Sequence, residues 1–222
     1  DVARQSERGE QRGDAVRETP ELADAGERED EGEGDRLGEA EAARQVLGAL
    51  FRYQLGLRDG FFRADEESLM RVVRSVRRHR PAVVITNAVQ DRHPDHGRAA
   101  ALVAEACFLS GLRRIHTHDE GASQPEWRPR AVYHMIQDRW IDPDLVVDTT
   151  AFWSTKQAAL ACFKSQFHDP DSTEPVSPIS VPEFMPTLEG RDRGMGRLIG
   201  AAFGEGFTVA RPPGVDDLLS LG

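Results

Sequence analysis

Long apolar runs and an excess of positive charge are both missing from this sequence of 222 residues. No stretch approaches about eighteen consecutive apolar residues, and no basic-then-apolar leader is present, which argues against a membrane span and a secretory signal. The formal net charge of −10 argues against a general nucleic-acid binder, because such proteins need a basic surface. Cysteine is scarce too. Cys107 and Cys162 lie in apolar helical runs, which indicates reduced thiols in a cytoplasmic protein.

The first forty residues differ in composition from the rest of the chain. They contain 14 acidic residues and 6 arginines, with no aromatic residue and no isoleucine. Such a segment buries too little apolar area to offset the entropy of ordering it. We therefore expect residues 1–40 to be an acidic, disordered leader and residues 41–222 to form one domain.

Hydrophobic periodicity predicts an α/β domain built on a Rossmann-like, mostly parallel sheet flanked by helices. The run 82–86 is almost wholly apolar, as is typical of a central strand buried on both faces. A turn is expected at 58–60. The patterns predict helices over 39–50, 65–79, 98–109, 152–167 and 183–198, and strands over 51–55, 82–86, 131–136, 145–147 and 206–210.

The loop after strand 82–86 holds the densest set of reactive side chains, Asp91-Arg92-His93-Pro94-Asp95-His96. Ligands of open α/β sheets bind beyond the carboxyl ends of the strands. An imidazole there could bind a cation, and a carboxylate could orient an imidazole. The simpler interpretation is that Asp95 caps the next helix and that His93 and His96 are solvated.

This loop resembles the second motif of the LmbE-like/PIG-L zinc N-acetylglucosaminyl deacetylases, and most of all their bacillithiol-biosynthesis branch. The resemblance covers residues 41–218 and implies that family's Rossmann-like fold, one Zn²⁺ per subunit, and hydrolysis of the N-acetyl group of N-acetylglucosaminyl malate. Further matching segments are Leu55-Gly-Leu-Arg-Asp59-Gly-Phe-Phe62, Asp148 with Lys156 and Ser165-Gln-Phe167, and Glu205-Gly-Phe207.

The resemblance also implies roles for single residues. His96 matches the zinc ligand, and His93 matches the histidine that stabilises the tetrahedral oxyanion and assists the leaving amine. Asp95 matches the carboxylate that supports His93. Arg92 could bind a substrate carboxylate, although a salt bridge to an acidic residue is an equal alternative. Asp148 could line the crevice or simply cap a helix.

The family's first motif, a buried strand followed by His-Pro-Asp-Asp-x-Glu, has no counterpart in residues 1–40. Because that motif supplies two zinc ligands and the general base, we expect impaired activity. A mistranslated or fragmentary gene start is one explanation. The other is a non-catalytic protein that binds a sugar or a homologous subunit. In either case we expect a small amino-sugar conjugate as ligand, no nucleic-acid or membrane partner, and a homo-oligomer as one option.

The remaining candidate residues have structural interpretations. The glycine-rich stretch 194–200 resembles a dinucleotide-binding loop only superficially, because it follows a polar helical pattern instead of a strand, and we expect a helix end and a turn. His116 and His118 are expected at the surface and His134 in the core. His168 begins a loop and has no evident partner.

Overall fold

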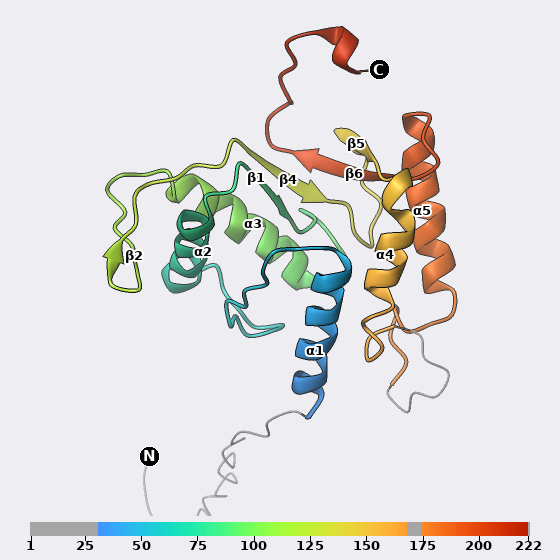
Figure 1. Ribbon diagram of the computed structural model, residues 1–222, viewed down its shortest axis with the longest axis horizontal. Helices are drawn as coiled ribbons and strands as arrows, with labels where there is room; N and C mark the ends of the chain where they lie inside the picture. Colours follow the sequence, from blue (N-terminus) through green and yellow to red (C-terminus); the bar gives the residue numbers. More distant parts are fainter. Residues whose placement is uncertain (1–30, 168–174, 222) are drawn as a thin grey trace, which may run out of the picture.

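The computed structural model describes residues 31–167 and 175–221, and they form an α/β domain, as predicted (Figure 1). Its elements are α1 (Glu31–Val46), α2 (Glu66–His79), β1 (Val83–Thr86), α3 (Pro94–Leu109), β2 (His118–Asp119), β3 (Ala122–Ser123), β4 (Ala131–Met135), β5 (Leu145–Asp148), η1 (Thr150–Phe152), α4 (Trp153–Leu160), α5 (Phe184–Leu198), β6 (Gly204–Val209) and η2 (Leu218–Leu221).

The main sheet has the strand order β1-β4-β6-β5 and is mixed. β1 and β4 are parallel, with Val83 opposite Ala131, whereas β6 runs antiparallel to both β4 and β5. The expected mostly parallel sheet is therefore only partly observed. Because β1, β4 and β5 point the same way, their carboxyl ends share one edge of the sheet. Hairpin β2-β3 forms a separate two-stranded sheet.

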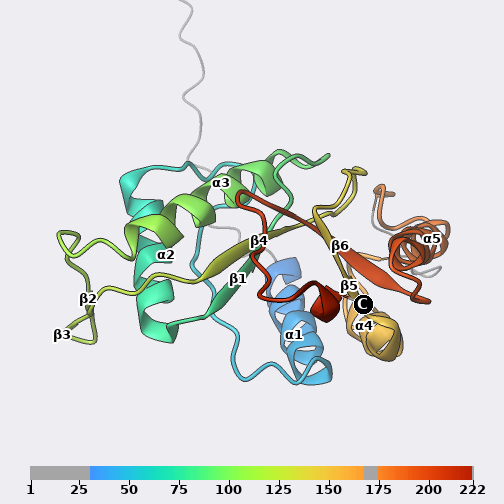
Figure 2. The same ribbon diagram turned by 90° about the horizontal axis from the view of Figure 1, so that it is seen from above.

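Helices α2 and α3 pack against each other, and α3 also contacts β1 and β4 (Figure 2). α2 starts where its sequence predicts, because the Asp65 carboxylate accepts a hydrogen bond from the Ser68 N–H at 2.9 Å. Val84 and Val132 of the sheet pack against the buried core. The buried residues of this core are Val72, Val73, Val76, Leu102, Ala106 and Cys107.

At the other end of the sheet, α5 packs on β5 and β6. A Cβ added to Gly196 would lie 2.7 Å from the Phe203 carbonyl carbon, so glycine permits this close approach. Residues 194–198 lie inside α5, which confirms that this stretch is no dinucleotide loop. Lys156 of α4 pairs with the buried Asp192 at 2.6 Å and with Glu205 of β6, which ties three elements together.

Three expected elements differ in the structure. α1 begins at Glu31, inside the expected leader, and contacts α4. Residues 51–55 were expected to form a strand but are irregular, because no strand among the described residues pairs with them. α4 ends at Leu160, and residues 161–167 form turns instead of continuing the helix. The expected loop over 170–182 is observed from residue 175 onward, and its earlier part lies outside the described residues.

The two cysteines are free thiols, as expected. Burial raises the pKa of Cys107 to about 11, so this thiol is neutral and unreactive near pH 7. Cys162 is half-buried, and its thiol donates to the Ala158 carbonyl oxygen at 3.4 Å.

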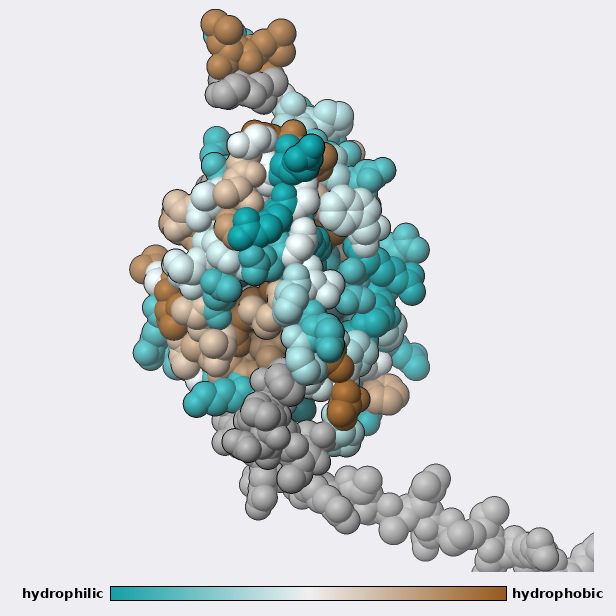
Figure 3. Space-filling view, turned by 90° about the vertical axis from the view of Figure 1, so that its right-hand side faces the viewer, coloured by the Kyte–Doolittle hydropathy of each residue, from teal (hydrophilic) through white to brown (hydrophobic). Residues whose placement is uncertain are grey.

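The face that carries α4 and α5 mixes hydrophilic residues with smaller hydrophobic patches (Figure 3). The C-terminal turn η2 stands clear of the body in Figure 1, and Leu218 and Leu219 are both exposed. None of the helices in the described parts of the chain is long and apolar enough to cross a bilayer.

The prediction that strand 82–86 is central and buried is wrong. Within residues 31–167 and 175–221, β1 pairs only with β4 and is an edge strand. Val84 packs toward the core, but Val83 and Ile85 point to the opposite face and are 44% and 57% exposed. An apolar edge strand of this kind is a site where another chain can add a strand.

We expect Ile85→Lys to reduce self-association without unfolding the protein. A lysine at an exposed edge position opposes strand addition, and the Ile85 side chain contributes little to the core. Light scattering during incubation at raised temperature measures self-association of the wild type and the variant. The matched control is Val84→Lys, which places a charge in the core and should cost more than about 2 kcal/mol. Equal scattering by wild type and Ile85→Lys would contradict the prediction.

Candidate functional site

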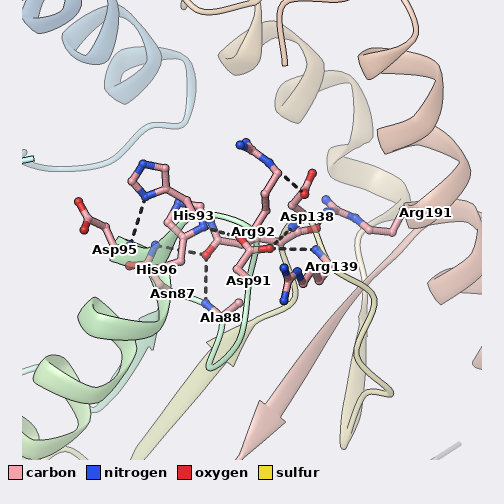
Figure 4. Close-up of polar contacts among 11 residues, drawn as sticks. Asn87, Ala88, Asp91, Arg92, His93, Asp95, His96, Asp138, Arg139 and Arg191 are labelled. Carbon is pink, nitrogen blue, oxygen red and sulfur yellow. Dashed lines mark hydrogen bonds and ion pairs between the residues drawn. The ribbon is translucent and has the colours of Figure 1, made fainter. Parts of the chain in front are cut away.

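The loop with the two histidines joins the carboxyl end of β1 to the start of α3 (Figure 4). Pro94 occupies the first turn of α3, where its missing N–H costs no hydrogen bond. His93 is the cap residue, because its Nδ1 accepts a hydrogen bond from the backbone N–H of Asp95 at 3.2 Å. The alternative in which the Asp95 side chain caps this helix is therefore not observed.

Asp91 is the carboxylate that orients a histidine. Its side chain is completely buried and bonds His96 Nδ1 through Oδ2. Its other oxygen accepts the backbone N–H groups of Asp138 at 3.1 Å and Arg139 at 2.9 Å. Burial by itself raises the pKa of Asp91, but the hydrogen bonds from His96, Arg139 and Arg92 hold that pKa below its ordinary value. Asp91 is thus a carboxylate at neutral pH.

Further hydrogen bonds fix the loop that follows β4. The Gln137 side-chain oxygen accepts from the Ala88 N–H at 3.0 Å and from the Asn87 amide at 3.2 Å. Arg191 of α5 donates to the Gln137 carbonyl oxygen. His134 bonds the Asn87 carbonyl oxygen through Nδ1 at 3.1 Å. The loops after β1 and β4 therefore form one connected network, which Figure 4 shows around Asn87, Ala88 and Arg191.

The two imidazole rings lie close together, with centroids 5.4 Å apart and planes inclined by 37°. In the neutral form of each ring, these hydrogen bonds assign opposite tautomers. His96 donates from Nδ1 to a carboxylate, which leaves a lone pair on Nε2. His93 accepts at Nδ1, so its proton is on Nε2. One ring thus presents an acceptor or metal ligand, and the other presents a donor.

The carboxylate of Asp59, which the sequence places in a turn and in a segment that resembles the deacetylase family, also reaches this site. A carboxylate oxygen of Asp59, a ring nitrogen of His93 and a carboxylate oxygen of Asp95 all lie within 4.8 Å of one another. Gly60 adopts φ 73°, which shapes the turn. The Asp-Gly pair at 59–60 indicates a turn in the sequence, but no local pattern indicates that Asp59 lies close to His93.

Asp95 is buried and has a different role from the expected one. Its Oδ2 accepts the Gly60 N–H at 2.5 Å, and its Oδ1 lies 2.8 Å from an Arg98 nitrogen without hydrogen-bond alignment. Arg98 also donates to the carbonyl oxygens of Gly60 and Phe62. Among the described contacts the Asp95 carboxylate bonds no imidazole and holds the turn with Asp59 against α3, so its support of His93 stays a prediction.

Each of the two expected substrate-binding residues has a partner within the protein, and their binding of substrate stays a prediction. Arg92 forms an exposed ion pair with Asp138, with Nε 3.2 Å from Oδ2. Asp148 accepts the Thr150 N–H at 2.9 Å, and hydrogen bonds from the Thr150 side chain and backbone lower the pKa of the Asp148 carboxyl. β5 is separated from β1 by β4 and β6, so Asp148 lies about 14 Å across the sheet from the histidine loop.

The other histidines lie outside this site. His116 and His118 are exposed, as expected. His134 is buried and has a hydrogen-bond partner, which confirms its structural interpretation. His168 lies outside the described residues.

Comparisons with known proteins find similarity to the PIG-L family over part of the chain. Residues 7–107 match the family model "PIG-L: GlcNAc-PI de-N-acetylase", which includes the histidine loop and begins inside the segment 1–40. The curated 4-oxalmesaconate hydratase of Pseudomonas putida is 29% identical over 134 residues, or 60% of this chain and 51% of the hydratase. The chain thus spans about half the length of that relative.

Solved structures share the fold. A conserved protein of Thermus thermophilus has a TM-score of 0.72 and 26% identity, with 83% of this chain and 77% of that chain covered. The 4-carboxy-2-hydroxymuconate hydratase of Pseudomonas putida has a TM-score of 0.65 and 23% identity, with 83% of this chain and 75% of the hydratase covered. The N,N'-diacetylchitobiose deacetylase of Pyrococcus horikoshii has a TM-score of 0.65 and 22% identity over 81% and 64%.

We expect Asp91→Asn to destabilise the protein by about 1–3 kcal/mol at pH 7, because the charged acceptor of three hydrogen bonds is lost. The folded pKa of Asp91 is lowered, so its contribution is present above about pH 4 and disappears as pH falls through the folded value. Urea unfolding at pH 7 and at about pH 3 measures the free energy of unfolding of the wild type, of Asp91→Asn and of a control variant. Asp138→Asn, which loses only the exposed pair with Arg92, should change stability by less than about 1 kcal/mol. An Asp91→Asn effect of the same size at both pH values would contradict this explanation.

Proposed function

We propose that this chain, as a PIG-L/LmbE-like protein, is the histidine-bearing part of a metal-dependent deacetylase that acts on an N-acetylglucosaminyl conjugate. N-acetylglucosaminyl malate, the bacillithiol-pathway conjugate, is the first substrate to test. The observation that carries the proposal is the pair of close imidazoles in opposite tautomers, His93 and His96, at the carboxyl end of β1. A cytoplasmic location and a small-molecule ligand remain predictions, as do the option of a homo-oligomer and the absence of nucleic-acid and membrane partners.

The residues of the loop fit a divalent zinc ion. His96 offers Nε2, since a buried carboxylate engages Nδ1, and this is the usual arrangement of a metal-ligating histidine. The carboxylates of Asp59 and Asp95 lie within 4.8 Å of a ring nitrogen of His93, and this group does not include His96. Asp95 Oδ1 is a buried oxygen with no hydrogen bond. Nitrogen and carboxylate donors are the set that zinc accepts. When bound, zinc would polarise the acetamide carbonyl and lower the pKa of water.

His93 is the proposed proton donor of the reaction. Its Nε2–H is free to donate to the oxygen that becomes negative when the amide carbonyl is attacked. The same proton can then pass to the departing amine, which needs it to leave as a neutral group. The Nδ1 hydrogen bond to the Asp95 N–H fixes the ring at the start of α3, so the donor is already oriented.

Asp95 takes a positioning role in this proposal. Together with Arg98 it fastens the turn 58–62 to α3 and so keeps Asp59 beside His93. Asp91 has the equivalent role for His96. Loss of either carboxylate should weaken metal binding by about 10- to 100-fold, as is usual for groups that orient a ligand.

We expect His96→Ala to lose bound zinc, and His93→Ala to retain zinc but to lose about 10²- to 10⁴-fold in turnover. The reason is that His96 presents a lone pair whereas His93 presents a proton. Elemental analysis and acetate release from N-acetylglucosaminyl malate measure the two effects. His116→Ala, an exposed histidine away from the loop, is the control and should change neither quantity. Retention of zinc by His96→Ala with loss by His93→Ala would show that the metal is held by the group of Asp59, His93 and Asp95.

A second candidate function is the hydration of an unsaturated acid, because two of the relatives are named hydratases. Hydration also needs a polarised carbonyl and a positioned proton donor, and the histidine pair would supply both groups. The third candidate is the non-catalytic protein that binds a sugar or a homologous subunit.

Parallel assays of the zinc-loaded chain separate these functions. We expect slow acetate release from N-acetylglucosaminyl malate, because the first motif of the family has no counterpart in residues 1–40. We expect no consumption of 4-oxalmesaconate, which is measured by its ultraviolet absorbance. Consumption of 4-oxalmesaconate alone would establish the hydratase instead. Bound zinc, or saturable binding of the sugar conjugate, without either reaction would favour the non-catalytic protein.

A further inference from the structure

A second cluster of polar side chains lies on α2, away from the histidine loop. Arg71, Arg74 and Arg78 follow each other at intervals of three and four residues, which places them on one face of the helix. They border a pocket of about 290 Å³. The residues lining this pocket are Tyr53, Leu55, Arg71, Arg74, Ser75, Arg78 and Asp119.

The outer two arginines of this cluster have partners within the protein. Arg71 donates to the Leu55 carbonyl oxygen at 2.9 Å and to the Glu67 carboxylate at 2.6 Å. Arg78 bonds the Asp119 carboxylate through Nε at 2.6 Å. These contacts fix both guanidinium groups at the two ends of the pocket, so little conformational entropy is lost when either group meets a ligand.

Arg74, between them, is different. It is half-buried, and no hydrogen bond or ion pair of its guanidinium is found in residues 31–167 and 175–221. The nearby Arg77 does not compete for the same ligand, because it points into the core and donates to four oxygens of the segment 110–117. Arg74 is therefore a cation in a pocket without an acidic partner of its own.

The charge of this pocket is opposite to that of the whole protein. Three arginines and one aspartate line it, and Glu67 pairs with Arg71, which leaves a formal charge of +1 on a chain of net charge −10. Partly burying a charged group without a partner is unfavourable. A guanidinium binds planar or tetrahedral oxyanions with two parallel hydrogen bonds. An oxyanion would thus satisfy Arg74, and the Ser75 hydroxyl adds a neutral donor beside it.

We propose that this pocket binds the phosphate or carboxylate group of a small anionic molecule, with Arg74 as the main contact. The pocket is distinct from the histidine site. Arg74 stands nine residues after the cap Asp65, about 13 Å along the axis of α2, whereas the turn beside Asp95 lies just before that cap. The volume of about 290 Å³ suits a small metabolite.

Titration of the full chain with inorganic phosphate and, separately, with succinate tests this site at constant ionic strength. The amide resonances of Tyr53, Arg74 and Ser75 report binding in ¹⁵N-correlated spectra. We expect saturable shifts at these three positions with at least one of the two anions. Saturation by phosphate alone identifies a phosphate-bearing ligand, and saturation by succinate alone identifies a carboxylate-bearing one.

The deciding variant is Arg74→Gln, which keeps a long polar side chain and removes the charge. It should weaken the affinity for the anion by about tenfold or more, because a charge-assisted pair is lost. Arg197→Gln, an equal charge change at an exposed position of α5, should leave the affinity unchanged. Unchanged affinity in Arg74→Gln, or shifts that never saturate in the wild type, would overturn the proposal. Circular dichroism checks that both variants remain folded.

Discussion

The hydrogen bond between Asp91 and His96 is the interaction on which the rest of the site depends. Its acceptor is the fully buried carboxylate of Asp91, in the loop that follows the carboxyl end of β1. A buried carboxylate is tolerated only when donors surround it, and two of its donors are backbone N–H groups of Asp138 and Arg139, after β4. The site therefore exists only where β1 and β4 pair in parallel and end together. The Asp91 carboxylate therefore links the parallel pairing of β1 with β4 to the orientation of His96.

The two histidines obtain different chemistry from different local partners. A carboxylate makes His96 a donor at Nδ1, whereas a backbone N–H makes His93 an acceptor there. Three residues of separation across the start of α3 are enough to bring the rings to 5.4 Å. Amide hydrolysis and hydration can both use such a pair of groups.

Local patterns predicted the elements that depend on local interactions. α2 has its apolar stripe and its Asp65 cap, and the loop 91–96 lies where a strand meets a helix, as expected. The errors concern partners distant in sequence. The alternation in 51–55 has no neighbouring strand among the described residues, and β1 lacks a second neighbour there. Asp91 contacts residues 47 and 48 positions away, and no local pattern predicts contacts over such a separation in sequence.

Direct observation of the imidazole protons tests this account most closely. Long-range ¹H–¹⁵N spectra of the protein labelled at histidine distinguish the two neutral tautomers of each ring above the histidine pKa. We expect His96 to carry its proton on Nδ1 and His93 to carry its proton on Nε2. The same tautomer on both rings, or a His96 spectrum unchanged by Asp91→Asn, would contradict it.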